Sequence, residues 1–167
     1  MPITTADTTT ALELFGSNPQ AADAETLESL RVITLQIAQY KQRKLAERSL
    51  RFIASHDELT GLLNRAALQH ELAHAIRRSN RQQKPFAVMF VDLDRFKHIN
   101  DTLGHGVGDQ MIRICGERLT ALLRDTDVVA RFGGDEFVLL LENLSATKDA
   151  EVLAEKVLAC CAAPFVI

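Results

Sequence analysis

The segment Val128–Leu141 reads VVARFGGDEFVLLL and holds two apolar runs on either side of a Gly-Gly pair. Two such runs joined by glycines predict an antiparallel hairpin, because the favoured two-residue turns need positive φ angles that glycine adopts without strain. We expect strands over 128–132 and 135–141. Asp135 and Glu136 follow the glycines directly, so their carboxylates should lie at the turn end of the hairpin.

An extended segment, Phe86–Asp94, follows Pro85 and reads FAVMFVDLD. Both of its alternating sets of side chains are apolar, which predicts a central strand covered on both faces. Asp92 and Asp94 close this strand, and residues two apart share one face of a strand. Both carboxylates should therefore reach the same side of the sheet.

If the hairpin lies beside this strand, four carboxylates gather at one end of the sheet: Asp92, Asp94, Asp135 and Glu136. Carboxylates at strand ends commonly hold a nucleotide and its metal, and Mg²⁺ prefers oxygen ligands that include substrate phosphates. Such a concentration of negative charge is costly unless a cation lies within it. The residues alone leave two interpretations open, metal-dependent phosphoryl chemistry or a set of solvated acidic side chains.

The remaining chain predicts an α/β fold in which helices flank a mixed central sheet. Expected helices cover 25–54, 66–78, 108–123 and 148–162, and residues 164–167 resemble the start of a further strand. We expect a flexible tail over 1–23, a linker or dimerisation helix over 24–56, and an α/β domain over 57–167. The apolar pattern of the first helix fits packing on its own domain or pairing with a second copy as a short coiled coil.

Composition narrows the class of protein. With 47% hydrophobic and 25% charged residues and a net charge of −3, the chain is an ordinary globular protein and not a binder of nucleic-acid polymers. Three cysteines without a CxxC pair favour a reduced, cytoplasmic protein. No apolar run is long enough to span a membrane, and the first residues, MPITTADTTT, do not resemble a signal peptide.

Four ordered motifs resemble the GGDEF family of diguanylate cyclases. Arg131–Phe137 reads RFGGDEF, Val91–Asp101 reads VDLDRFKHIND, Gly104–Asp109 reads GHGVGD, and Asp57–Arg65 reads DELTGLLNR. They are similar to the family's GGDEF signature and to its VDxDxFKxxND, GHxxGD and DxLTGLxNR segments. The resemblance implies a fold like that of nucleotide cyclases and polymerase palms, and a nucleotidyltransferase that makes the bacterial second messenger cyclic di-GMP from two GTP molecules.

The resemblance also implies a Mg²⁺ or Mn²⁺ site and the residues that carry the chemistry. Asp92, the backbone carbonyl of Leu93, Asp135 and Glu136 would hold the metal. Asp135 or Glu136 would accept the proton of the attacking 3′-hydroxyl, and Lys97 would face the phosphates.

Substrate recognition is implied for a second group of residues. Asn100 and Asp109 would hydrogen-bond the guanine, with His105 close by. Gly133 and Gly134 would let the turn wrap the triphosphate. A carboxylate accepts hydrogen bonds from the N1 and N2 edge of guanine, whereas adenine offers no such donor pair.

The segment Arg124–Asp127, RDTD, fits the family's RxxD inhibitory site, which implies feedback inhibition by cyclic di-GMP through Arg124 and Asp127. The alternative is a helix end with a capping charge pair. Each subunit of the family holds one GTP, so catalysis implies a homodimer. The helix over 24–56 would bring the two domains together by raising their effective concentration.

Two other functions compete with the cyclase. The family's domain extends beyond Ile167, so we expect a domain that lacks its C-terminal part and a chain with little activity and marginal stability. That favours a non-catalytic module that binds GTP or cyclic di-GMP. His70, Glu71 and His74 match HExxH, which makes a zinc hydrolase a remote alternative to an exposed polar helix.

Overall fold

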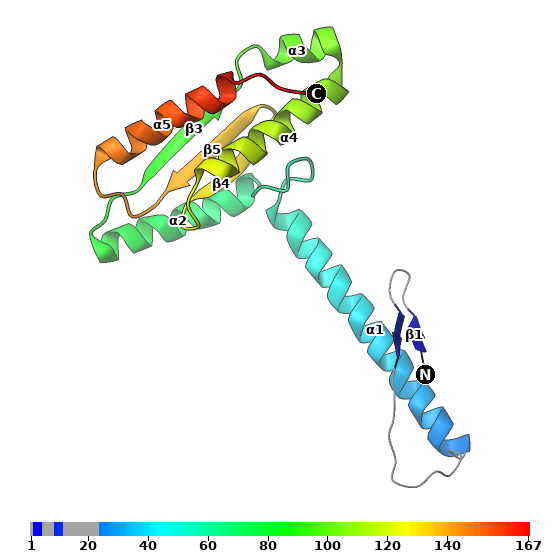
Figure 1. Ribbon diagram of the computed structural model, residues 1–167. Helices are drawn as coiled ribbons and strands as arrows, with labels where there is room; N and C mark the ends of the chain where they lie inside the picture. Colours follow the sequence, from blue (N-terminus) through cyan, green and yellow to red (C-terminus); the bar gives the residue numbers. More distant parts are fainter. Residues whose placement is uncertain (1, 5–8, 12–23) are drawn as a thin grey trace. The chain divides into compact units, whose positions relative to one another are not determined.

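The computed structural model describes residues 2–4, 9–11 and 24–167 (Figure 1). The chain divides into two units, residues 1–52 and 53–167. In the first unit, the strands β1 (Pro2–Thr4) and β2 (Thr9–Ala11) pair antiparallel. The rest of the expected flexible tail over 1–23 lies outside the described residues.

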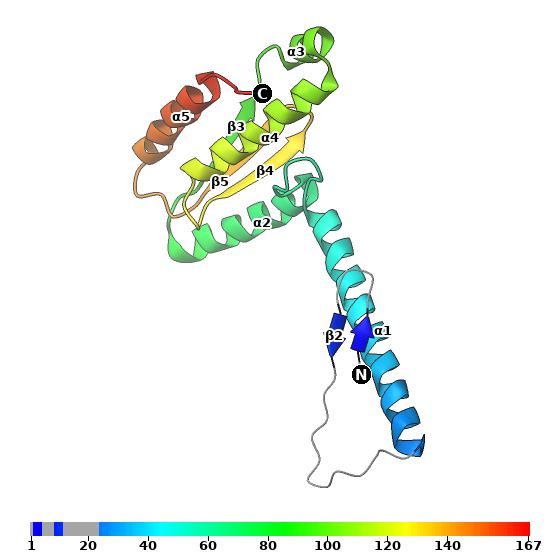
Figure 2. The same cartoon turned by 45° about the vertical axis from the view of Figure 1, so that its right-hand side comes forward.

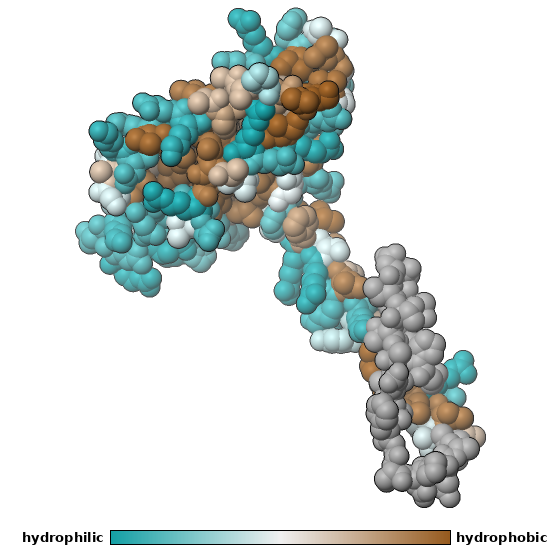
Figure 3. Space-filling view, in the orientation of Figure 1, coloured by the Kyte–Doolittle hydropathy of each residue, from teal (hydrophilic) through white to brown (hydrophobic). Residues whose placement is uncertain are grey.

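Helix α1 (Ala24–Ser55) runs for 32 residues, as the absence of glycine and proline predicts. Leu30, Ile33, Ile37 and Tyr40 follow a 3-4-3 spacing that places them along one face. Ile33 is 46% exposed and Tyr40 is 63% exposed, and brown apolar patches interrupt the polar surface of this helix (Figure 3). No described helix is both long and apolar enough to cross a membrane.

The sheet of the second unit holds three antiparallel strands in the order β3–β5–β4. They are β3 (Ala87–Asp92), β4 (Val128–Gly133) and β5 (Glu136–Leu141). A parallel bridge between Leu63 and Ala130 adds a different pairing at the edge of β4. Helices and sheet thus form the expected α/β architecture, and its strands pair antiparallel throughout this sheet.

The prediction that Phe86–Asp94 is a central strand covered on both faces is wrong. Strand β5 is central, and β3 has one described neighbour. Val88 is 39% exposed and Phe90 is 70% exposed, whereas Phe137 and Leu139 of β5 are fully buried. The alternation of side chains along a strand indicates whether its two faces are apolar. It does not indicate whether one or two strands pair with it.

The hairpin turn lies one residue later than the sequence predicts. Gly133 pairs with Glu136, so the two loop residues are Gly134 and Asp135, and the register shifts between Arg131 and Gly133. Gly134 has a φ of 43°, in the left-handed region that favours glycine. The irregular register brings Glu136 to the first position of β5.

Two layers of helices cover the sheet (Figures 1 and 2). Helices α4 (His105–Leu122) and α5 (Thr147–Ala162) pack on one face, where Ile112 and Val157 join the core with Phe137. Helix α2 (Arg65–Gln82) packs on the other face. There Leu68 meets Ala130 and Val138.

Helix boundaries follow local chemistry. Asn64 caps α2 by accepting a 3.0 Å hydrogen bond from the Ala67 N–H. The sequence analysis did not predict helix α3 (Phe96–Leu103), because the helix is short. It begins after Arg95, whose left-handed φ of 60° could not be predicted from any motif. Helix α4 begins at His105, three residues before the expected start. The expected strand over 164–167 is not formed.

Candidate active site

Two acidic residues far apart in the chain meet at one end of the sheet. Asp92, the last residue of β3, pairs directly with Glu136, the first residue of β5. Opposed residues of an antiparallel pair project from the same face with Cβ atoms about 4.5–5.5 Å apart. The fully buried Phe137 keeps β5 in this register, and both acidic residues remain exposed to solvent. The arrangement presents two carboxylates beside the turn at Gly134.

The other two acidic residues do not complete a cluster of four. Strand β3 ends at Asp92, so Asp94 lies in a turn and does not share its strand face. Asp135 lies in the two-residue loop before β5. Within residues 2–4, 9–11 and 24–167, no three His, Cys, Asp or Glu side chains group closely enough to hold a metal. The expected gathering of four carboxylates is therefore absent from the described structure.

A cavity of about 290 Å³ opens beside the end of β3. Asp92, Leu93 and Asp94 line one side, Met111 lines another, and α5 contributes four residues, Val157, Leu158, Cys161 and Ala162. Leu93 is only 5% exposed, and its carbonyl accepts from the Phe96 N–H at 3.2 Å. A carbonyl oxygen has two lone pairs and can accept a second partner.

This donor set fits a hard divalent cation that shares its coordination with a substrate. Mg²⁺ usually takes one or two carboxylates and leaves other positions to phosphates and water. The paired Asp92 and Glu136 would supply the carboxylates for such an ion, and Leu93 and Asp135, close by in sequence, could offer further oxygens. A full cage of protein ligands is not required for this ion.

A buried acceptor without a partner lies between α3 and α4. Asn100 Oδ1 has no hydrogen-bond partner in the described structure, and it is shielded from solvent. A Cβ built on Gly108 would lie 1.9 Å from this oxygen, so only glycine leaves room for the Asn100 side chain. An unsatisfied buried acceptor costs about 1–3 kcal/mol. A ligand with an N–H donor would remove that cost.

Three other candidate residues lie on α3 and α4. Lys97 lies on α3, and His105 and Asp109 lie on the first turns of α4. All three are exposed. Their backbones are thus placed near Asn100, and their side chains are open to an incoming molecule.

Arg131 supports the glycine turn in a way that the sequence analysis missed. Its Nε and Nη2 donate to the Gly134 carbonyl at 2.9 and 2.7 Å. Its Nη1 lies 3.1 Å from both carboxylate oxygens of Asp57. Asp57 Oδ1 also accepts from the backbone N–H and the hydroxyl of Thr60 at 2.9 and 2.7 Å. Arg131 and Asp57 both belong to motifs in the sequence. The position of Arg131, two residues before the glycines, could have indicated a role in supporting the turn.

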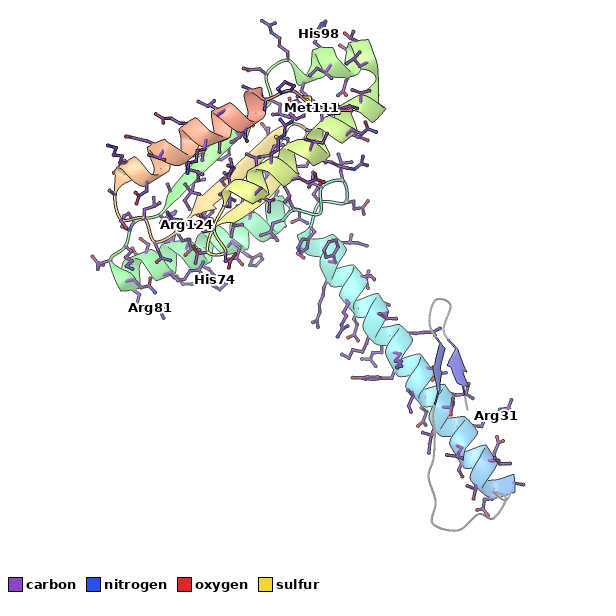
Figure 4. All side chains as sticks on the ribbon, in the orientation of Figure 1. Arg31, His74, Arg81, His98, Met111 and Arg124 are labelled. Atoms are coloured by element: carbon purple, nitrogen blue, oxygen red, sulfur yellow. The ribbon has the colours of Figure 1, made fainter. Side chains whose placement is uncertain are left out.

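The RxxD residues lie at the other end of the sheet. Asp127 directly precedes β4, and Arg124 is labelled there in Figure 4. They line a cavity of about 170 Å³ together with Lys156 and Asp149 of α5. Asp127 accepts from the backbone N–H groups of Arg124 and Glu142, each at 3.2 Å. Asp127 thus holds the turn before β4 through hydrogen bonds to the backbone. The Arg124 side chain is exposed and forms no ion pair with any described residue.

The HExxH residues lie on α2, as expected. The described chain offers no group of three metal-ligating side chains there, and Glu71 lies 3.7 Å from the Arg78 guanidinium. His74 instead borders a surface hollow with three arginines, Arg77, Arg78 and Arg81. This surface is a basic helix face.

Residues 54–167 match the family model described as diguanylate cyclase, GGDEF domain. The chain therefore belongs to the GGDEF family. It is 46% identical over 113 residues to the cyclic di-GMP phosphodiesterase NbdA and 44% identical over 117 residues to the diguanylate cyclase TpbB, both of Pseudomonas aeruginosa. These matches cover 68% and 70% of this chain but only 14% and 27% of those relatives.

Solved structures agree with this assignment. The isolated GGDEF domain of TpbB, also called YfiN, from P. aeruginosa superposes with a TM-score of 0.64 at 44% identity, covering 66% of this chain and 64% of that one. The coiled coil and GGDEF domain of DgcB from Caulobacter crescentus, solved with cyclic di-GMP, gives a TM-score of 0.70 at 28% identity. That match covers 77% of this chain and 68% of DgcB.

Proposed function

We propose that this protein is a diguanylate cyclase that condenses two GTP molecules into cyclic di-GMP. The observation that carries the proposal is the direct pairing of Asp92 with Glu136 beside the glycine turn. Membership of the GGDEF family and relatives named diguanylate cyclase support it. A substrate drawn from the cellular GTP pool agrees with a cytoplasmic location.

Asp92, the Leu93 carbonyl, Asp135 and Glu136 are the residues that would hold Mg²⁺ or Mn²⁺. The ion would neutralise phosphate charge and polarise the α-phosphate when bound with GTP. Glu136 or Asp135 accepts the proton of the attacking 3′-hydroxyl. Lys97 faces the phosphates, and Gly133 and Gly134 let the backbone approach them because neither carries a side chain.

Guanine recognition falls to the α3–α4 pair. Asp109 accepts hydrogen bonds from the N1 and N2 donors of guanine. Asn100 of α3 has a buried oxygen that lacks a partner, and His105 at the start of α4 would contribute to the same recognition. Adenine offers no equivalent donor pair, and an unpaired buried acceptor would disfavour it by a few kcal/mol, roughly.

Each domain offers one nucleotide site, so formation of a cyclic product from two GTP molecules needs two subunits with their sites opposed. The exposed apolar face of α1, with Ile33 and Tyr40 seven residues apart, supports a homodimer. Pairing of two α1 helices would raise the effective concentration of the second domain.

Turnover by the 167-residue chain tests the proposal. The chain is incubated with GTP and Mg²⁺, and cyclic di-GMP is measured by chromatography beside Glu136→Gln, Asp92→Asn and the exposed control Glu151→Gln. We expect little but measurable product from the wild type and from Glu151→Gln, and a further loss of at least 100-fold in the other two variants, roughly the contribution of one catalytic group. Equal rates in all four proteins would contradict the assigned site.

A non-catalytic module that binds GTP or cyclic di-GMP is the competing outcome. It would show nucleotide binding by calorimetry with no product from any form of the chain. The Asn100→Ala variant separates a specific loss of nucleotide binding from misfolding. Its GTP affinity should fall while its thermal unfolding stays cooperative.

Binding of cyclic di-GMP at a second site is supported by the cavity between α4 and α5. Arg124 can donate two hydrogen bonds to guanine O6 and N7, and the Lys156 ammonium lines the same cavity for a phosphate. Occupation of this cavity by the product would inhibit the enzyme by feedback. Calorimetry with cyclic di-GMP should show at least tenfold weaker binding to Arg124→Ala, and unchanged affinity would exclude this site.

A further inference from the structure

The three cysteines of the chain gather where α4 meets α5. Cys115 of α4 and Cys161 of α5 are 46 positions apart in sequence, yet their Sγ atoms are 4.0 Å apart. Cys115 is fully buried in the core, whereas Cys160 and Cys161 are partly exposed. None of these thiols has a role in the proposed cyclase reaction.

The two facing thiols differ in access and in chemistry. Cys161 lines the same cavity as Asp92 and Asp94, and it is partly exposed to solvent. Cys115 is sealed from solvent and is reached through its partner thiol. An attack from outside should therefore begin at Cys161 and finish at Cys115.

Local hydrogen bonds favour the Cys161 thiolate, which is the reactive form of the side chain. Hydrogen bonding with Cys115 lowers the pKa of Cys161, and Cys160 and the positive charge of Arg118 help it to outweigh burial, which raises that pKa. The Arg118 guanidinium holds the end of α5 by donating to the carbonyls of Cys160 and Ala163 at 2.8 and 2.9 Å.

We propose that Cys161 and Cys115 form a redox-modification site that closes into a reversible disulfide between α5 and α4. With hydrogen peroxide as the oxidant, the Cys161 thiolate attacks one peroxide oxygen, the O–O bond breaks, and one water leaves after protonation. The resulting Cys161 sulfenic acid is then attacked by the Cys115 sulfur, which loses its proton as a second water leaves. Two electrons pass from the thiol pair to the peroxide, and a dithiol reductant reverses the step.

Closure of this bond would tie α5 to α4 at the wall of the cavity beside Asp92. The sulfurs must approach from 4.0 Å to about 2.05 Å, which a small shift of two packed helices can supply. Disulfides in reducing compartments are usually transient and serve redox sensing. The pair is thus suited to respond to peroxide rather than to act as a permanent crosslink.

Peptide mapping tests the proposal on the full 167-residue chain. The reduced protein is treated with hydrogen peroxide, alkylated and digested without reductant. We expect a crosslinked peptide pair containing Cys115 and Cys161, its loss after dithiothreitol, and a Tm increase on the order of 5–10 °C in the oxidised protein. Cys160→Ser is the matched control and should form the same crosslink.

Two variants identify the order of attack. Cys161→Ser should remain uncrosslinked and keep Cys115 reduced. Cys115→Ala should accumulate a Cys161 sulfenic acid that a dimedone probe labels. A crosslink through Cys160, a crosslink only between two chains, or dimedone labelling of Cys161 that is equal in the wild type and Cys115→Ala would each overturn the proposal.

Discussion

Arg131 Nη1 lies 3.1 Å from both carboxylate oxygens of Asp57, although 74 positions separate the two residues. The same guanidinium donates two hydrogen bonds to the Gly134 carbonyl. The first motif of the domain is thereby joined to the glycine turn that presents Asp135 and Glu136. A planar group with several fixed donors suits this bridging position, which a lysine could not fill.

Loss of the Asp57 carboxylate charge should destabilise the domain. Asp57→Asn weakens the hydrogen bonds to Arg131 and Thr60, and we expect the free energy of unfolding to fall by about 1–3 kcal/mol. Urea denaturation monitored by circular dichroism measures the change. Glu58→Gln is the control, because Glu58 is the exposed neighbour, and it should unfold at the wild-type midpoint.

The same contact predicts acid sensitivity. Burial alone would raise the pKa of Asp57, but hydrogen bonds from Thr60 and Arg131 outweigh it and lower the pKa. A lowered folded-state pKa contributes stability above the unfolded value of about 3.9, and this contribution is lost as the pH falls through the folded-state pKa. The Tm difference between wild type and Asp57→Asn should therefore shrink below about pH 4. A difference that grows on acidification would argue against this contact.

Gly108→Ala should impair nucleotide binding. The added Cβ would lie 1.9 Å from Asn100 Oδ1, so the Asn100 side chain must leave its position between α3 and α4. We expect GTP affinity to fall at least tenfold, about 1.4 kcal/mol, by calorimetry. Gly106→Ala is the matched control, because nothing lies within 4 Å of its added Cβ. Equal loss in both variants would point to the helix backbone rather than to Asn100.

The two RxxD residues should separate into a structural and a ligand-binding role. Asp127→Ala removes both side-chain hydrogen bonds to backbone N–H groups and should lower the free energy of unfolding by about 1–3 kcal/mol without any ligand. Arg124→Ala removes an exposed side chain and should leave unfolding within about 0.5 kcal/mol of the wild type. Thermal denaturation of both proteins without nucleotide checks this difference. A stable Asp127→Ala protein would mean that the turn does not depend on this carboxylate.

Dimerisation should depend on the apolar face of α1. Replacing Ile33 and Tyr40 together by lysine places two charges on the face that a partner helix would cover. We expect a monomer in sedimentation velocity at concentrations where the wild type is a dimer. Gln42→Lys, an exposed change on the same helix away from the Ile33–Tyr40 face, should sediment as the wild type does.

Much of the fold follows from local patterns. The helices over α1, α2 and α5 and the hairpin of β4 and β5 lie where apolar periodicity and the glycine pair predict them. Helix α3 was not predicted, because its eight residues form only about two turns. Its start also depends on the left-handed conformation of Arg95. Periodicity needs several turns before it exceeds chance.

For the candidate site too, the sequence indicated the residues but not their arrangement in space. Motif residues such as Asp92, Glu136 and Asn100 were identifiable from their order in the chain. Their mutual placement was not, because sequence spacing carries no information on which strands are neighbours. The expected set of four carboxylates failed for this reason: β3 ends at Asp92, and Asp94 turns away from the strand.

The chain's residues and their order were enough to indicate the family and the acidic hairpin, because both depend on local side-chain types at short spacing. The pairing of Asp92 with Glu136, the Arg131–Asp57 contact and the meeting of Cys115 with Cys161 depend on contacts 44 to 74 positions apart. Such contacts arise when the whole core packs, since the buried faces of the sheet and helices select one register among many that local preferences allow.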